Sequence, residues 1–167
     1  MKQIAIQDAN ILIDLLMAGM FNHCLALQYQ FCTTDIILDE LYEEQVGFIK
    51  PHIYSGKFYV ITISPEELEQ IAALANANRL ISPEDWSAIY FAEQKAALLL
   101  SGDGAVREIA TARKLTVCGT LWILDQLVGN DILPTQQAAV FLKALLDKKR
   151  RLPVSECQAR LKLWSGP

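Results

Sequence analysis

The chain has 167 residues, of which 52% are hydrophobic and 20% charged, and 15 Lys and Arg residues against 19 Asp and Glu residues give it a net charge of −4. This length and composition indicate one globular domain and exclude a disordered or fibrous chain. The acidic balance argues against a protein that coats nucleic acid through bulk positive charge. Any nucleic-acid function must therefore depend on a local site.

The cysteines and histidines indicate neither a zinc finger nor a thioredoxin-like site. No two of the four cysteines stand in a C-x-x-C spacing, and the chain has only two histidines. The first residues lack the apolar core of a signal peptide, and no apolar run approaches the roughly 18 residues of a membrane helix. We therefore predict a protein of the cytoplasm that has no membrane contact.

Short apolar runs alternate with longer helical patterns, which predicts an α/β fold with a parallel sheet covered on both faces. No repeat or flexible linker divides the chain, so we expect a single domain over residues 1–167, in which residues 134–167 form a C-terminal helical extension. In chain order the predicted elements are strand 4–6, helix 9–17, strand 30–33, helix 35–44, strand 58–62, helix 66–77, helix 83–93, strand 97–100, helix 105–113, strand 115–117, helix 121–127, helix 135–148 and helix 155–164.

Two aspartates stand where predicted strands end and helices begin. Asp8 directly follows strand 4–6, and Asp103 follows strand 97–100. In open parallel sheets, ligand sites form at the carboxyl ends of the strands. Each aspartate alone is equally well interpreted as a helix N-cap, which stabilises a helix by about 1 kcal/mol. Together they make a candidate site.

Two further acids also have alternative interpretations. Asp85 ends the sequence Ser-Pro-Glu-Asp at residues 82–85, where the partner in a capping box is the favoured interpretation of the residue alone. Glu40 is predicted within helix 35–44 beside apolar residues, where an acid that meets only solvent is less expected.

Four short motifs contain these acids in order along the chain. They are DANILIDL at residues 8–15, TDIILDEL at 34–41, DWSAIYFA at 85–92 and SGD at 101–103. The first is similar to the opening D-x-[NS] motif of the PIN domain family of metal-dependent ribonucleases, and the second resembles the motif of that family with a helical Glu, here Glu40. The third and fourth resemble its D-x-x-x-I-x-x-A helix and its [TS]-x-D motif. The resemblance covers roughly residues 1–130.

The resemblance implies a three-layer α/β/α sandwich around a short parallel sheet, with Asp8, Glu40, Asp85 and Asp103 converging at one edge as catalytic residues. Crowded carboxylates repel one another and need cations, and oxygen ligands without His or Cys select Mg²⁺ or Mn²⁺. One or two such ions would polarise a phosphodiester and lower the pKa of a bound water. In this interpretation all four acids serve the metal, with Asp8 and Asp103 as direct ligands.

Polar and basic residues around the four acids are assigned with alternatives. Asn10 and Ser101 would hydrogen-bond to the metal ligands or their waters. For Asn10, a hydrogen bond to the backbone at the helix start is an equally good interpretation, and for Ser101 a cap in the loop. Candidate phosphate contacts are Arg107 and, in the one dense basic run, Lys148, Lys149 and Arg150. For that run, a solvated helix end is the favoured interpretation.

Two hypotheses for the function follow. The first is a Mg²⁺- or Mn²⁺-dependent endoribonuclease acting on single-stranded or structured RNA, and many small members of the resembled family are toxins held by an antitoxin protein. The alternative is a non-catalytic PIN-like module that binds nucleic acid or protein, which the acidic surface and the C-terminal helices suggest. We expect those helices to pack on the domain, with a homodimer or antitoxin surface as the other interpretation.

Overall fold

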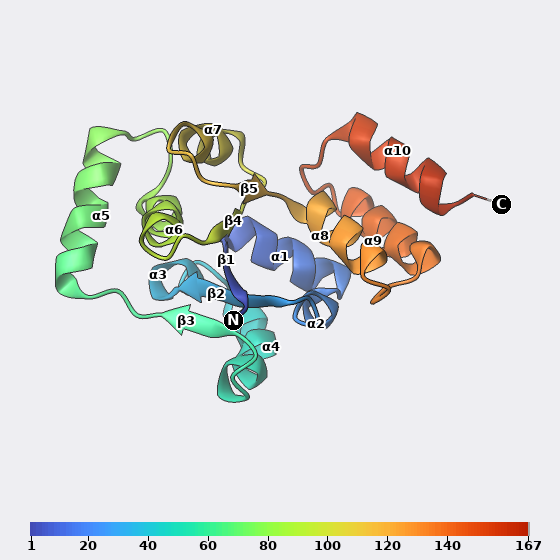
Figure 1. Cartoon of the computed structure of the whole chain (residues 1–167), viewed down its shortest axis with the longest axis horizontal. Helices are drawn as coiled ribbons and strands as arrows, with labels where there is room; N and C mark the ends of the chain where they lie inside the picture. Colours follow the sequence, from blue (N-terminus) through green and yellow to red (C-terminus); the bar gives the residue numbers. More distant parts are fainter. Residues whose placement is uncertain (167) are drawn as a thin grey trace.

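The computed structural model describes residues 1–166, which fold around a five-stranded parallel sheet (Figure 1). Its strand order is β3-β2-β1-β4-β5, so the chain builds the sheet outward from β1 on one side and then on the other. The strand order therefore reverses at β1 and β4, and this is where α/β sheets form ligand sites. The strands are β1 (Gln3–Gln7), β2 (Tyr29–Thr34), β3 (Tyr59–Ile61), β4 (Leu98–Leu100) and β5 (Val117–Cys118).

Helices cover both faces of the sheet and form the two outer layers. Helix α1 packs with α4, α8 and α9, whereas α6 packs with α3 and α5 and lies across β1, β2 and β4. This confirms the predicted α/β/α sandwich. The helices are α1 (Ala9–Ala18), α2 (Phe21–Cys24), α3 (Asp35–Leu38), α4 (Glu43–Tyr54), α5 (Pro65–Ala77), α6 (Pro83–Gln94), α7 (Gly104–Ala112), α8 (Thr120–Gly129), α9 (Thr135–Asp147) and α10 (Val154–Trp164).

The core lies on either side of β1 and β4. Both strands are buried at their carboxyl ends, and β1 pairs with β2 and β4 in parallel, with Ala5 opposite Phe31 and Leu98. Every residue of α6 from 86 to 92 is buried. Helix α6 therefore holds its first turn, which contains Asp85, in a fixed position beside the sheet edge.

The sequence-based prediction was wrong for residues 35–44, which do not form one helix. Helix α3 ends at Leu38, residues 39–42 form a turn, and α4 begins at Glu43. The second helix has its own start signal, because the Tyr42 N–H donates to Gln45 Oε1 over 2.9 Å. Glu40 therefore lies in a turn and not within a helix.

The fifth strand begins two residues later than predicted. Lys114 has a φ of 63°, and the Leu115 N–H donates to the Ala110 carbonyl over 3.0 Å, so residues 114 and 115 close the end of α7. The other predicted strands and helices overlap the observed ones.

The C-terminal helices pack on the rest of the chain. Helix α9 contacts α1 and α8, and α10 lies on α9, where it buries Cys157 and Trp164. Within residues 1–166, no helix has both the length and the apolar character needed to cross a membrane.

Candidate functional site

Asp8 combines a structural and a free carboxylate oxygen. Its Oδ1 accepts the Ile11 N–H over 2.8 Å, which caps α1, so the N-cap interpretation is right for this oxygen. Its Oδ2 is buried and has no hydrogen-bond partner within the described residues. Buried carboxylate oxygens are normally paired. The unpaired oxygen at the carboxyl end of β1 therefore requires a functional explanation.

The electrostatics of Asp8 follow from its burial, because only 1% of the residue is exposed. Burial raises the pKa of Asp8 to about 6, although the Ser101 hydroxyl and the Ile11 N–H lower it. Repulsion from Asp85 and Asp14 raises it further. The charged form of Asp8 is therefore unfavourable without a cation nearby.

Asp85 enters the same electrostatic field from α6. The Ser82 hydroxyl caps this helix by accepting the Asp85 N–H over 3.1 Å. Burial raises the pKa of the Asp85 carboxyl, and repulsion from Asp103 and Glu84 adds to it, against the lowering effect of Ser82. The sequence analysis did not single out Glu84 as part of the acidic edge.

Glu40 approaches from the turn between α3 and α4. Burial raises its pKa to about 7, and repulsion from Glu84, Asp85 and Asp8 contributes to the shift. The residue as a whole is exposed, and its charge is repelled by those of the other acids. The displaced helix boundary thus leaves Glu40 beside the predicted partners.

Asp103 and Ser101 complete the edge at the end of β4. Asp103 Oδ1 accepts the Val106 N–H over 2.9 Å and caps α7, while the Asp103 N–H donates to the Ser101 hydroxyl over 3.2 Å. Ser101 is fully buried, whereas Asp103 is exposed. Ser101 therefore lies between the two aspartates as a polar support, and Asp103 presents its carboxylate to solvent.

The four acids share one electrostatic environment without forming a closed metal cage. Each of them repels at least one of the others. Among residues 1–166, no three Asp, Glu, His or Cys side chains lie close enough to enclose an ion. Mg²⁺ usually keeps several waters and binds through one or two carboxylates together with substrate phosphates. Separated oxygen donors with one unpaired oxygen on Asp8 fit that kind of binding.

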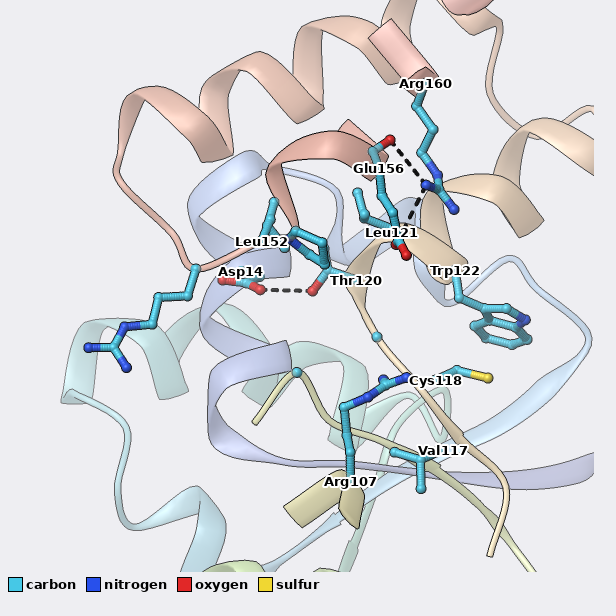
Figure 2. Close-up of a pocket in the computed structure, with 14 residues that line it drawn as sticks. Asp14, Arg107, Val117, Cys118, Thr120, Leu121, Trp122, Leu152, Glu156 and Arg160 are labelled. Atoms are coloured by element: carbon cyan, nitrogen blue, oxygen red, sulfur yellow. Dashed lines mark hydrogen bonds and ion pairs between the residues drawn. The ribbon is translucent and has the colours of Figure 1, made fainter. Parts of the chain in front are cut away.

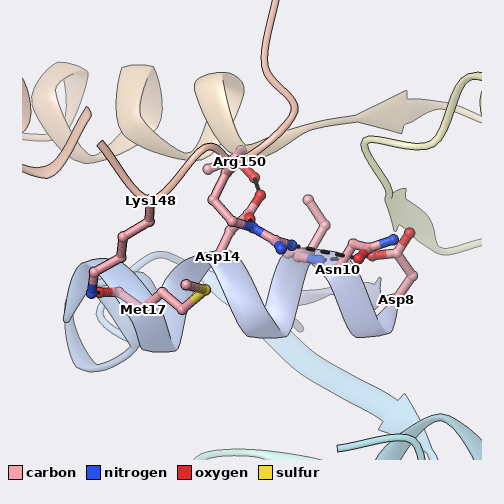
Figure 3. A network of polar contacts seen from close by, with 8 residues as sticks. Asp8, Asn10, Asp14, Met17, Lys148 and Arg150 are labelled. Atoms are coloured by element: carbon pink, nitrogen blue, oxygen red, sulfur yellow. Dashed lines mark hydrogen bonds and ion pairs between the residues drawn. The ribbon is translucent and has the colours of Figure 1, made fainter. Parts of the chain in front are cut away.

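Asn10 joins a network between α1 and the C-terminal extension (Figure 3). Arg150 donates to Asp14 Oδ1 and, over 3.5 Å, to Asn10 Oδ1, while the Thr120 hydroxyl donates to Asp14 Oδ2 over 2.7 Å. Lys148 donates to the Met17 carbonyl over 2.6 Å. Two of the predicted phosphate contacts, Lys148 and Arg150, therefore attach the C-terminal extension to α1.

Asp14 is the buried acid that the sequence analysis missed. It is 6% exposed and pairs with Arg150, which lies 136 residues further along the chain. Its place in the DANILIDL segment, six residues after Asp8, gave no signal of this pair. Arg107 is nearer to the acidic edge, where its Nη1 donates to the Ser101 carbonyl over 3.1 Å.

These features define a parallel α/β domain with carboxylates gathered at the point where its strand order reverses. The family profile of the PIN domain matches residues 4–166, so the chain belongs to the PIN domain family. This confirms the resemblance found in the four motifs and extends it through the C-terminal helices.

A solved structure agrees on the fold. The crystal structure of PAE2754 from Pyrobaculum aerophilum is similar with a TM-score of 0.54 and 17% sequence identity, over 77% of this chain and 99% of the other. At that identity, the likeness concerns the fold alone. Among curated proteins, none matches this chain.

Proposed function

We propose that this PIN domain protein is a Mg²⁺- or Mn²⁺-dependent endoribonuclease that hydrolyses RNA phosphodiester bonds. Its catalytic residues are Asp8, Glu40, Asp85 and Asp103. The observation that supports this most directly is the buried Oδ2 of Asp8, which has no hydrogen-bond partner within the described residues and belongs to a carboxylate that Asp85 and Asp14 repel. A helix cap needs only one acceptor oxygen, as the Ser82 hydroxyl provides for α6, and a second buried oxygen without a partner costs stability.

The residues of the chain divide the chemistry among them. Asp8 and Asp103 would bind the cation directly, and Asp85 and Glu40 would complete its surroundings. A divalent cation held there supplies polarisation of the phosphodiester and positive charge for the leaving oxygen. Glu40 would take up the proton of the attacking water as a general base.

The test is metal-stimulated cleavage of a mixed RNA pool by the purified protein and by Asp8→Asn and Asp103→Asn variants. Asparagine still accepts an N-cap hydrogen bond, so both variants should fold. We expect cleavage in Mg²⁺ or Mn²⁺ that each variant reduces by at least about a hundredfold. Cleavage that survives both substitutions would show that a contaminating nuclease or another site is responsible.

A non-catalytic binding module is the second candidate function. The observation in its favour is that no three potential ligands among residues 1–166 enclose an ion. Under this alternative, the protein binds RNA or a protein partner equally well with and without Mg²⁺, and Asp8→Asn leaves that binding unchanged. Isothermal titration of Mg²⁺ into the wild type and the Asp8→Asn variant separates the two candidates.

A toxin role extends the ribonuclease proposal to the cell. If the protein is the toxin of a toxin–antitoxin pair, expression should stop growth, and Asp103→Asn should relieve the arrest. An antitoxin encoded beside it should restore growth when the two proteins are expressed together. Growth arrest that Asp103→Asn does not relieve would speak against an RNA-cleaving toxin.

A further inference from the structure

Two hollows adjoin the C-terminal extension, and Figure 2 shows the residues that line the larger one. One hollow of about 320 Å³ lies between the β5–α8 turn and the segment that connects α9 to α10. A second hollow, of about 280 Å³, reaches Asp103. The two share Asp14, Gly102 and Arg151 along their walls, and we call them together the connector groove.

The arginines of the connector groove differ in how their charges are balanced. Arg150 is paired with Asp14, and Arg160 donates to both carboxylate oxygens of Asp125 over 2.8 and 2.6 Å. Arg151 is exposed and has no hydrogen-bond or ion-pair partner within the part of the chain that is described. Arg107 gives one hydrogen bond to an uncharged carbonyl. Arg107 and Arg151 therefore carry positive charge that no acid of the groove neutralises.

The two ends of the connector groove have different chemistry. Arg151 lines both hollows and Asp103 lies in the second one, so unbalanced positive charge adjoins the acidic edge. Leu152, Trp122 and Glu156 line only the larger hollow, so they make the part of the connector groove that Asp103 does not reach. The Glu156 side chain is 59% exposed and lies 3.9 Å from Arg160, so it is only weakly paired. An anion fits the first end, and a flat ring with a hydrogen-bond donor fits the second.

The volume of the larger hollow and the way a base can enter it favour an unpaired nucleotide as the occupant. The larger hollow falls within the roughly 300–1,000 Å³ range of small-molecule pockets. A base can enter such a hollow only when it is unstacked and unpaired, as in single-stranded RNA. Aromatic and apolar walls bind bases by stacking and contact, and arginines bind the phosphates.

We propose that the connector groove binds one nucleotide of a single-stranded RNA next to the cleaved bond, with its phosphate at Arg107 and Arg151 and its base against Trp122 and Leu152. This inference rests on the proposed function, because it places the cleaved bond at the acidic edge. The Glu156 carboxylate accepts a hydrogen bond from an exocyclic amino group, which cytosine has and uracil lacks. The C-terminal extension thereby gives the protein a preference for cytosine over uracil at this position.

The experiment measures binding of fluorescent oligocytidine and oligouridine to the full-length protein in EDTA, where RNA stays intact whether or not the protein is a nuclease. The variants are Arg151→Ala, Glu156→Gln and, as a matched control, Lys143→Ala. Lys143 is an exposed cation on α9 that lines neither hollow. Thermal melting checks that the variants fold.

We expect Arg151→Ala to weaken the binding of both oligomers on the order of tenfold. It should also reduce the magnitude of the slope of log affinity against log salt concentration by about 0.7. Lys143→Ala should change neither quantity. The wild type should bind oligocytidine more tightly than oligouridine, and Glu156→Gln should remove that difference.

Two outcomes would overturn the inference: Arg151→Ala binding both oligomers as tightly as Lys143→Ala, or the wild type failing to distinguish cytidine from uridine. Absence of measurable RNA binding would overturn it as well. These results do not depend on cleavage. If the protein binds as expected but cleaves no RNA, the connector groove is supported and the ribonuclease proposal fails. If it cleaves RNA but the variants do not bind as expected, the ribonuclease proposal stands and the connector groove fails.

Discussion

Two buried aspartates of the same chain segment show how one residue type serves two purposes. Asp14 has both carboxylate oxygens paired, one with Arg150 and one with Thr120. Asp8, at the start of the same helix, has one oxygen paired with a backbone N–H, whereas the other makes no full hydrogen bond, although the Ser101 hydroxyl is near enough to lower the pKa of the carboxyl. A satisfied buried charge joins the C-terminal extension to α1, whereas the unsatisfied one lies where we propose that a cation binds.

Removing the satisfied acid should have the largest effect on stability. Asp14→Ala leaves the Arg150 guanidinium without its counter-charge, and we expect it to lower the free energy of unfolding by about 3 kcal/mol, the lower end for buried pairs because Arg150 is partly exposed. Urea denaturation measures the change. Asp14→Asn, which keeps an oxygen for the Thr120 hydroxyl, should cost less, and equal losses would contradict the assigned ion pair.

Removing the charge of Asp8, the unsatisfied acid, should instead raise the free energy of unfolding. Asp8→Asn keeps the N-cap acceptor and removes a charge whose pKa lies at about 6, while the buried amide offsets part of the gain. We expect the metal-free variant to be about 2 kcal/mol more stable than the wild type at pH 8. Below about pH 3 the difference should vanish, because Asp8 is then protonated in both the folded and the unfolded state. A destabilised variant at pH 8 would contradict the comparison.

The pH dependence of Mg²⁺ binding tests the proposed cation site at Asp8 and Glu40. The pKa values of Asp8 and Glu40 are raised on folding, so the folded state holds more protons and loses stability as the pH rises from about 4 to 7. Mg²⁺ binds the deprotonated groups. At ten times its Kd it should add about 1.4 kcal/mol at pH 8, roughly 3–6 °C in Tm, and clearly less at pH 5.5. Equal shifts at both pH values, or shifts that survive Asp8→Asn, would locate the cation elsewhere.

A second attachment of the C-terminal extension should be weaker than the Asp14 pair. Arg160 on α10 pairs with Asp125, whose side chain is 40% exposed. Solvent screens this pair, so Arg160→Ala should cost only about 1 kcal/mol in urea denaturation. Combined with Asp14→Ala, it should add its effect nearly independently, because the two pairs share no side chain. A loss as large as that of Asp14→Ala would contradict the ranking by burial.

The sequence predicted the features that local patterns determine. Asp8 and Asp103 follow apolar strand runs and begin helices, so their place at the sheet edge was predictable from strand direction alone. The Arg150 pair was not, because Asp14 and Arg150 are 136 residues apart and nothing local links them. The turn at Glu40 was missed because TDIILDEL reads as one helical segment, whereas the start of α4 depends on the bond between Tyr42 and Gln45.

The double use of Asp8 has a consequence for the evolution of this protein. One carboxylate oxygen holds α1 and the other is free, and Asp and Asn codons differ by a single base. A one-base mutation could therefore silence the proposed chemistry without selection against misfolding. Descendants that bind RNA without cutting it lie one mutational step away, and the connector groove would pass to them unchanged.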